Sequence, residues 1–252
     1  MRSDFGPWLR GAERSLVLGH RGARRDAPEN TMLAFQCALD QGAQGVELDV
    51  RLARDGTVIV LHDRDLGRVT HQQDTRQAED LSATDLRSTN LGDGQTVPTL
   101  DQVLGWAQDT RALLNIELKS DVSSRRVLVD ATVAAVNQSG CPKEQLLFSS
   151  FHLGLLRGVA RALPQVPRGW LFERAWQGLP WVTQAARAAA LHPGHSLLSH
   201  ERIQRWLKRT PLLNTWTVNE PNVAQFLSKA GVNALISDTP GAILKAISSA
   251  SF

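Results

Sequence analysis

Cysteine is scarce in this sequence, with two residues in a chain of 252. Cys37 and Cys141 have neither the spacing of a metal site nor the number that a disulfide framework needs. We expect two free thiols, as is usual in the reducing cytosol. Long apolar runs are missing too: no stretch approaches the roughly 20 apolar residues of a membrane helix, and residues 1–15 contain no apolar core of a secretory signal. We therefore expect no transmembrane segment and a cytoplasmic location.

Dense clusters of one charge are also missing. The 28 Lys and Arg residues exceed the 25 Asp and Glu residues by only three, and they are spread along the chain. Without a run of basic residues, the sequence predicts no nucleic-acid partner. The hydrophobic fraction of 42% is enough for a full core, and 252 residues can form one large barrel or two small domains.

The sequence does contain a concentration of polar side chains within residues 18–63, each placed in or after a short apolar run. These side chains are His20, Glu47, Asp49 and His62. Glu47 and Asp49 alternate with valine and leucine, so both carboxylates share one face of an expected strand. Polar residues at strand ends are typical of the active sites of parallel α/β sheets.

The connection that follows decides the architecture. Only a few residues separate Val50 from Val58, and they include the turn signal Asp55–Gly56. A parallel crossover needs about a dozen residues or more. The apolar run at 58–61 is therefore expected to return antiparallel and to begin an insertion that covers about residues 52–98.

Outside this insertion, apolar runs and helical patterns alternate. The eight expected strands span residues 16–19, 44–51, 113–118, 146–149, 169–172, 188–191, 212–218 and 234–236. The alternation predicts a (β/α)8 TIM barrel. We expect one domain over residues 1–252, with a small cap inserted after the second strand.

Ten short motifs, in order along almost the whole chain, carry a family resemblance. They are His20–Gly22, Pro28–Thr31, Glu47–Val50, Asp55–Gly56, Leu61–Asp63, Pro98–Leu100, Asn115–Lys119, Ser149–Phe151, Trp216–Asn219 and Ser237–Pro240. With them the sequence closely resembles the glycerophosphodiester phosphodiesterases, most of all the compact cytosolic bacterial members. The resemblance implies a barrel with a small insertion, a divalent cation, and hydrolysis of glycerophosphodiesters to sn-glycerol 3-phosphate and an alcohol. The family often has a glycine-rich turn after Thr70, where this chain has His71-Gln72-Gln73-Asp74.

Three carboxylates are candidate metal ligands. Glu47, Asp49 and Glu117 come from two strand ends that should converge on the mouth of the barrel. Three like charges in one place repel one another unless a cation lies among them. Oxygen-only ligands suit a hard ion, Mg²⁺ or Ca²⁺, rather than zinc.

His20 and His62 are the candidate general acid and base. Cleavage of a phosphodiester needs one group to take a proton from the nucleophile and another to protonate the leaving alkoxide. Histidine can do both near neutral pH. The sequence leaves open which histidine is acid and which is base, and whether water or the substrate's own hydroxyl attacks.

Two cations are candidate phosphate ligands, because an arginine fork can bridge two phosphate oxygens and a lysine adds a point charge. They are Arg21 and Lys119. Glu29 is expected either to orient Arg21 or to reach the metal, and Asn30 or Thr31 should cap the helix that follows.

Three further residues are candidates for the substrate pocket. His192 should end its strand and line the pocket. Trp216 is expected at the mouth, where an indole would pack against the glycerol or the alcohol, although packing in the barrel core is an equal alternative. Phe151 has the same two alternatives.

Other functions remain open at this point. Trp170, Trp176 and Trp181 lie in or just after one strand and either pack helices onto the barrel or form an apolar lip for a lipid tail. Such a lip would favour a lysophospholipase D that releases lysophosphatidic acid. A sphingomyelinase D-like lyase would share the barrel and the histidines, but that family is typically secreted and disulfide-bonded. A catalytically inactive phosphodiester-binding module should lack a histidine or a carboxylate, and every such position is filled. The sequence does not fix the preferred alcohol, the choice of metal or the oligomeric state.

Overall fold

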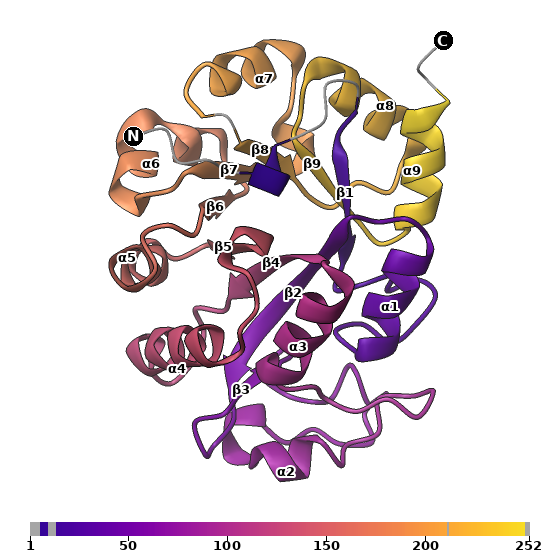
Figure 1. Cartoon of the computed structure of the whole chain (residues 1–252), viewed down its shortest axis with the longest axis vertical. Helices are drawn as coiled ribbons and strands as arrows, with labels where there is room; N and C mark the ends of the chain where they lie inside the picture. The colour runs from indigo at the N-terminus through magenta and orange to yellow at the C-terminus, as the bar shows by residue number, and fades with distance from the viewer. Residues whose placement is uncertain (1–5, 10–13, 211, 250–252) are drawn as a thin grey trace.

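A closed barrel of eight parallel strands forms the centre of the molecule, as predicted (Figure 1). The computed structural model describes residues 6–9, 14–210 and 212–249. The barrel closes because β1 pairs in parallel with both β2 and β9. Its strands are β1 Leu16–His20, β2 Gly45–Leu52, β4 Leu113–Leu118, β5 Leu146–Ser150, β6 Arg168–Phe172, β7 Ala190–Pro193, β8 Leu212–Thr215 and β9 Ala234–Ser237.

Helices surround the barrel and bury their apolar faces against the outer sides of the strands. They are α1 Met32–Asp40, α3 Leu100–Thr110, α4 Arg125–Gln138, α5 Leu153–Ala162, α6 Pro180–Ala186, α7 His200–Leu207, α8 Pro221–Ala230 and α9 Pro240–Ser248. Short 3₁₀ helices lie outside these strands and helices: η1 Gly6–Trp8, η2 Ala78–Asp80, η3 Lys143–Gln145, η4 Ala175–Gly178 and η5 His195–Leu197. Both cysteines are free thiols, as expected.

The amino end of the barrel is closed by an apolar plug, which we define as Trp8 and the inward-facing strand residues around it. Those strand residues are Leu18, Leu113, Leu147, Ala190, Leu212 and Ala234, and Ile236 continues the same cluster to the smaller cavity at the carboxyl end. Trp8 is 1% exposed, and its carbonyl accepts a hydrogen bond of 2.6 Å from Asn233. Burial of a complete indole stabilises this end of the barrel through both area and packing.

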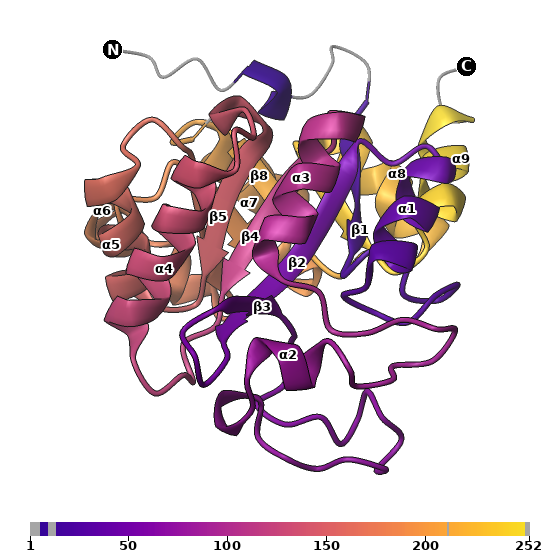
Figure 2. The ribbon, with the colours of Figure 1, turned by 60° about the horizontal axis from the view of Figure 1, so that its bottom comes forward.

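The insertion lies at the opposite end of the barrel from η1 (Figure 2). Strand β3, Val58–Val60, pairs antiparallel with the end of β2, which confirms the predicted hairpin. The segment beyond β3 contains η2 and the one-turn helix α2, Ala83–Leu86, and has an apolar core of its own. That core includes Ile59, Leu61, Leu66, Leu86 and Val97.

The insertion turns sharply at the place where the family resemblance leads one to expect glycine. His71 and Gln72 both have left-handed backbone, with φ of 52° and 65°. This conformation is costly for residues that carry a Cβ. The turn is held by Gln72, whose N–H donates to the Gly67 carbonyl at 2.7 Å, and by the Thr70 hydroxyl, which donates to the carbonyl of Leu66. Two residues that carry a Cβ therefore adopt a backbone conformation that glycine takes up more easily.

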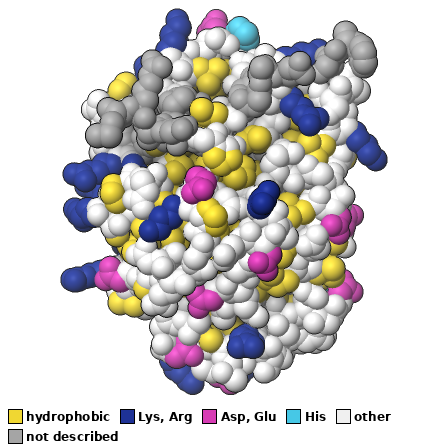
Figure 3. Space-filling model, viewed as in Figure 1, with side chains coloured by type: hydrophobic (Ala, Val, Ile, Leu, Met, Phe, Trp, Pro, Cys, Tyr) yellow, Lys and Arg dark blue, Asp and Glu magenta, His cyan; other side chains and the backbone are white. Residues whose placement is uncertain are grey.

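The surface shows no continuous band of one charge on the face in Figure 3, where basic and acidic side chains of the described residues are scattered. Within the described part of the chain, no helix has the length and apolarity needed to cross a bilayer.

Candidate active site

His20 ends β1 at the carboxyl end of the barrel and is held by an aspartate from the neighbouring strand end. Its Nδ1 lies 2.6 Å from Oδ1 of Asp238, which follows β9. A carboxylate can only accept, so the ring donates from Nδ1 and Nε2 is left to serve the pocket. Asn219 donates to the other oxygen of Asp238 at 2.8 Å. Burial alone would raise the pKa of Asp238, but these hydrogen bonds hold it at about 2.

His62 follows β3 and is held in the same way. Its Nδ1 lies 2.6 Å from Oδ1 of Asp63, and its carbonyl accepts a hydrogen bond of 2.9 Å from the buried Arg51 guanidinium. Burial lowers the pKa of His62, and the nearby charges of Lys119 and Arg21 lower it further. Asp49 and Asp63 oppose this effect without reversing it, and a lowered pKa favours the neutral imidazole, whose Nε2 can accept a proton.

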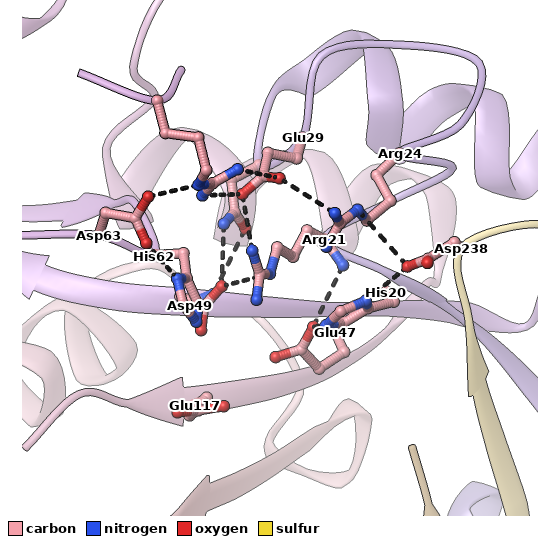
Figure 4. Close-up of polar contacts among 12 residues, drawn as sticks. His20, Arg21, Arg24, Glu29, Glu47, Asp49, His62, Asp63, Glu117 and Asp238 are labelled. Atoms are coloured by element: carbon pink, nitrogen blue, oxygen red, sulfur yellow. Dashed lines mark hydrogen bonds and ion pairs between the residues drawn. The ribbon is translucent and has the colours of Figure 1, made fainter. Parts of the chain in front are cut away.

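The three candidate metal ligands converge, as the sequence predicts (Figure 4). In strand register Asp49 stands beside Glu117, and one ligand atom from each of Glu47, Asp49 and Glu117 lies within 4.8 Å of the others. Asn30 fixes Asp49 by donating to its Oδ2 at 3.0 Å. The helix cap is Thr31 and not Asn30, because the Thr31 hydroxyl accepts from the N–H of Ala34.

Without a cation, ionisation of all three carboxylates is unfavourable, because they are buried and repel one another. Burial raises the pKa of Glu47 well above its usual range, and repulsion from Asp49 and Glu117 raises it further. Burial and the charge of Asp49 raise the pKa of Glu117 to about 7. Burial would also raise the pKa of Asp49, but the charges of Lys119 and Arg21 outweigh it and lower that pKa. Such a set of buried oxygens is what a hard divalent cation stabilises.

Arg21 lies at the centre of a network of charged side chains. Its backbone N–H donates to Glu47 at 3.1 Å, its Nη1 donates to Glu29 at 2.8 Å, and its Nε lies 3.3 Å from Asp49 Oδ2. Glu29 also accepts two hydrogen bonds from Arg68, which hold the pKa of Glu29 at about 2 against the effect of burial. Of the two roles predicted for Glu29, its contacts fit the orientation of Arg21.

Lys119 lies on the other side of Asp49. Its ammonium donates to Glu117 Oε1 at 2.9 Å and lies 3.4 Å from Asp49 Oδ1. Burial lowers the pKa of Lys119, but the two carboxylates more than compensate and the pKa is raised. Both predicted phosphate ligands therefore carry a charge beside the carboxylates.

Two cavities open around these residues. The smaller, of about 70 Å³, is lined by both histidines, Glu47, Glu117 and Lys119, together with Phe151 and Trp216. The rings of Phe151 and Trp216 meet edge to face at 5.5 Å, which places the two predicted aromatic residues at the mouth. The larger, of about 510 Å³, extends from His62 and Lys119 toward the insertion.

His192 does not line either cavity, so the prediction for this residue is wrong. Strand β7 runs to Pro193, two residues further than expected, and the imidazole is completely buried inside the barrel. Asn214 contacts its Nε2 at 2.9 Å, and the absence of a side chain at Gly169 leaves room for the ring. Burial lowers the pKa of His192 to about 3, so the ring stays neutral.

The sequence did not predict the roles of several residues that orient the site. Asp238 and Asp63 orient the histidines, Asn30 holds Asp49, and Arg51 holds the backbone of His62. Arg51 forms two further hydrogen bonds of 2.8 Å with Asp121. Two signals were present: Asp63 directly follows a predicted catalytic histidine, and Asp238 directly follows the strand that barrel closure places beside His20.

The residues present fit a divalent metal ion. Only carboxylate oxygens converge, and Oδ1 of Asp49 is buried with no hydrogen-bond partner among the described residues. Hard cations prefer such donors. Glu47, Asp49 and Glu117 are thus the residues that would hold the ion.

Comparison with known proteins gives matches over most of the chain. The model of the glycerophosphoryl diester phosphodiesterase family matches residues 20–242. A glycerophosphodiester phosphodiesterase of Caldanaerobacter subterraneus is 30% identical over 244 residues, which cover 93% of this chain and 98% of the relative.

Two solved structures share the fold. A Thermotoga maritima glycerophosphodiester phosphodiesterase is 30% identical, with a TM-score of 0.75 over 92% of this chain and 97% of that chain. An Oleispira antarctica phosphodiesterase, solved in complex with the product sn-glycerol-3-phosphate, is 27% identical, with a TM-score of 0.84 over 93% of this chain and 97% of that chain. The chain therefore belongs to the glycerophosphoryl diester phosphodiesterase family of enzymes.

Proposed function

We propose that the chain hydrolyses glycerophosphodiesters to sn-glycerol 3-phosphate and an alcohol, with His20 and His62 transferring protons beside a divalent cation. The observation that carries this proposal is that both histidines line one cavity with Glu47 and Glu117, each histidine with Nδ1 hydrogen-bonded to an aspartate. Family membership supports the same reaction class. The Oleispira antarctica relative supports sn-glycerol 3-phosphate as the product.

The two imidazoles supply the proton transfers. One Nε2 takes the proton of the attacking oxygen, from water or from a hydroxyl of the substrate's glycerol. The P–O bond to the alcohol then breaks, and the other imidazole protonates the departing oxygen. Each such transfer contributes about 10²–10⁴-fold to the rate. Attack by the glycerol hydroxyl would expel the alcohol and leave a cyclic phosphate, which a water molecule must then open to give sn-glycerol 3-phosphate. ³¹P NMR of single turnovers distinguishes the two nucleophiles by the presence or absence of this cyclic phosphate.

The side chains of Arg21 and Lys119 bind the phosphate of the substrate. Arg21 and Lys119 lie on opposite sides of Asp49, so a phosphate beside the carboxylates is within reach of both. Glu29 keeps the Arg21 fork in one orientation. When bound, Mg²⁺ or Ca²⁺ would offset the charges of the carboxylates and of the phosphate oxygens.

The test is release of glycerol 3-phosphate from a panel of glycerophosphodiesters, with and without EDTA and then with Mg²⁺ or Ca²⁺ restored. We expect turnover of glycerophosphocholine that EDTA abolishes and one cation restores. The His20→Ala variant should lose turnover yet retain metal-dependent binding of glycerol 3-phosphate. Turnover that is insensitive to EDTA and to His20→Ala contradicts the proposal.

A second candidate, lysophospholipase D activity, is favoured by one observation. Trp176 and Trp181 are 53% and 63% exposed, and Leu179 between them is exposed too, at the barrel end where β6 terminates. Only Trp170 is buried, so packing against the barrel explains one tryptophan of the three. Exposed indoles suit contact with an acyl chain or a lipid surface.

Replacement of both Trp176 and Trp181 by alanine separates the two activities. If lysophospholipids are substrates, the double variant should lose release of lysophosphatidic acid and keep turnover of glycerophosphocholine. Phe226→Ala, which removes another exposed aromatic ring, is the matched control. Equal activity of the double variant on lysophosphatidylcholine excludes a role for this surface.

A further inference from the structure

Two polar side chains in the smaller cavity have no part in the chemistry described so far. Asn115 and Ser149 line that cavity together with His20 and Glu47. Asn115 stands beside Glu47 in strand register, and Ser149 stands beside Glu117. Asn115 therefore comes from β4, the strand that carries Glu117, and Ser149 comes from the adjacent strand β5.

These two side chains are buried without hydrogen bonds. Asn115 is 1% exposed and Ser149 is 0% exposed. Within the described chain, neither amide atom of Asn115 nor the Ser149 hydroxyl has a partner. Buried polar atoms are almost always hydrogen-bonded, because an unmet donor or acceptor is costly. The neighbouring Ser150 obeys this rule: its hydroxyl donates to the Leu118 carbonyl and accepts from the N–H of His152.

The remaining walls of the cavity are apolar. Leu171, Ile236, Phe151 and Trp216 complete the lining. Beside the histidines and charged groups already described, the cavity thus presents a carboxamide on β4, a hydroxyl on β5 and four apolar side chains. A carboxamide offers both a donor and an acceptor, and a serine hydroxyl offers the same.

The substrate proposed above has one part that matches this lining. Its glycerol unit carries two free hydroxyls on a three-carbon chain, and each hydroxyl both donates and accepts. We propose that Asn115 and Ser149 bind these glycerol hydroxyls and so make the enzyme specific for the glycerol side of the diester. This inference rests on the proposed hydrolysis of glycerophosphodiesters.

The alcohol side then occupies the larger cavity. Its lining mixes charges of both signs, including Arg64, Asp65 and Asp121, with the exposed ring of Phe151. At about 510 Å³ against about 70 Å³, it is much the roomier of the two. The enzyme should therefore discriminate strongly at glycerol and weakly at the alcohol.

The test measures binding by calorimetry, so it does not depend on turnover. The probes are sn-glycerol 3-phosphate and n-propyl phosphate, which share the phosphate and the three-carbon chain and differ only in the two hydroxyls. Measurements use the metal-loaded wild type, Ser149→Ala and Asn115→Leu. Ser150→Ala is the matched control, because it removes a buried serine hydroxyl one residue away.

We expect the wild type to bind glycerol 3-phosphate more tightly than propyl phosphate, and each variant to reduce that ratio by about tenfold, the usual loss for one hydrogen-bonding group. Propyl phosphate should bind all proteins within about twofold, and Ser150→Ala should keep the wild-type ratio. A ratio near one in the wild type, or an unchanged ratio in both variants, overturns the proposal; the second result would mean that water occupies these groups or that the hydroxyls bind elsewhere.

Failure of the proposed function gives a different result. If the wild type does not turn over glycerophosphocholine, the hydrolytic assignment fails, while the binding ratio still tests the glycerol site. If turnover is normal and the ratio does not respond to Ser149→Ala or Asn115→Leu, the subsite fails alone.

Discussion

The two ends of the barrel are built from the same eight strands and have opposite interiors. At the amino end the apolar plug packs around Trp8. At the carboxyl end three buried carboxylates, two cations and two histidines face one another, and several of their polar neighbours lack hydrogen bonds. Inside the barrel, the amino end therefore adds apolar packing that stabilises the fold, while the carboxyl end buries charges at a cost in stability and holds the proposed active site.

The largest effect should follow from changing a carboxylate at the catalytic end. Glu117→Gln should lower turnover by about 10³-fold or more, because a lost metal ligand costs several kcal/mol of transition-state stabilisation. The free energy of unfolding in EDTA should be unchanged or higher, since a buried carboxylate is replaced by a neutral group. Glu144→Gln, at an exposed position, is the control. If Glu117→Gln lowered the free energy of unfolding as well as turnover, the carboxyl end would also contribute to stability, and the proposed difference between the two ends would be wrong.

The converse change affects the plug. Trp8→Ala should lower the free energy of unfolding by about 3–5 kcal/mol, the usual range for a buried tryptophan. The kcat of the remaining folded enzyme should be unchanged. Leu9→Ala, whose side chain is largely exposed, should be nearly neutral. Chemical denaturation gives the free energy of unfolding, and an activity assay at 25 °C gives kcat. A lower kcat in Trp8→Ala would show that the two ends of the barrel are coupled.

A smaller effect is expected from the residues that orient the histidines. Asp63→Asn should reduce kcat by about 10–100-fold, as for other groups that fix a catalytic imidazole. The hydrogen bond from His62 to Asp63 raises the pKa of His62, so its loss should shift the His62 limb of the pH–rate profile to lower pH. If kcat falls but the part of the pH–rate profile that reports His62 does not shift, Asp63 has a structural role only. Asp80→Asn, exposed in the insertion, is the control.

The smallest effect concerns His192, which lies between the two ends. Burial lowers its pKa to about 3, against about 6.5 in the unfolded chain. Below about pH 6.5 the unfolded state binds a proton that the folded state does not, so wild-type stability falls as pH decreases toward 3. Relative to His192→Gln, the wild type should lose up to about 1.4 kcal/mol per pH unit in this window. Urea unfolding of both proteins at pH 7, 6 and 5 measures this difference in the free energy of unfolding. A difference that does not change with pH would contradict the prediction.

The sequence predicted the barrel, the antiparallel hairpin and the convergence of the three carboxylates, because alternation along strands determines which side chains share a face. It did not predict the partner of His20, since Asp238 lies 218 residues away and its rotamer depends on packing around β9. His192 was misplaced for a related reason. Burial of its ring depends on Gly169 in the neighbouring strand β6, and no pattern within β7 reveals that neighbour.

The insertion has a consequence for how this enzyme can change. Asp63, Arg64 and Asp65 belong to the insertion and line the larger cavity, whereas Asn115 and Ser149 are fixed in barrel strands. The segment also has a core separate from that of the barrel. Exchange of the part of the insertion that follows Asp63, with His62 and Asp63 retained, should therefore change which alcohols are accepted while leaving the proposed glycerol site in place. Evolution, or an engineer, can diversify one half of the substrate while the other half is inherited.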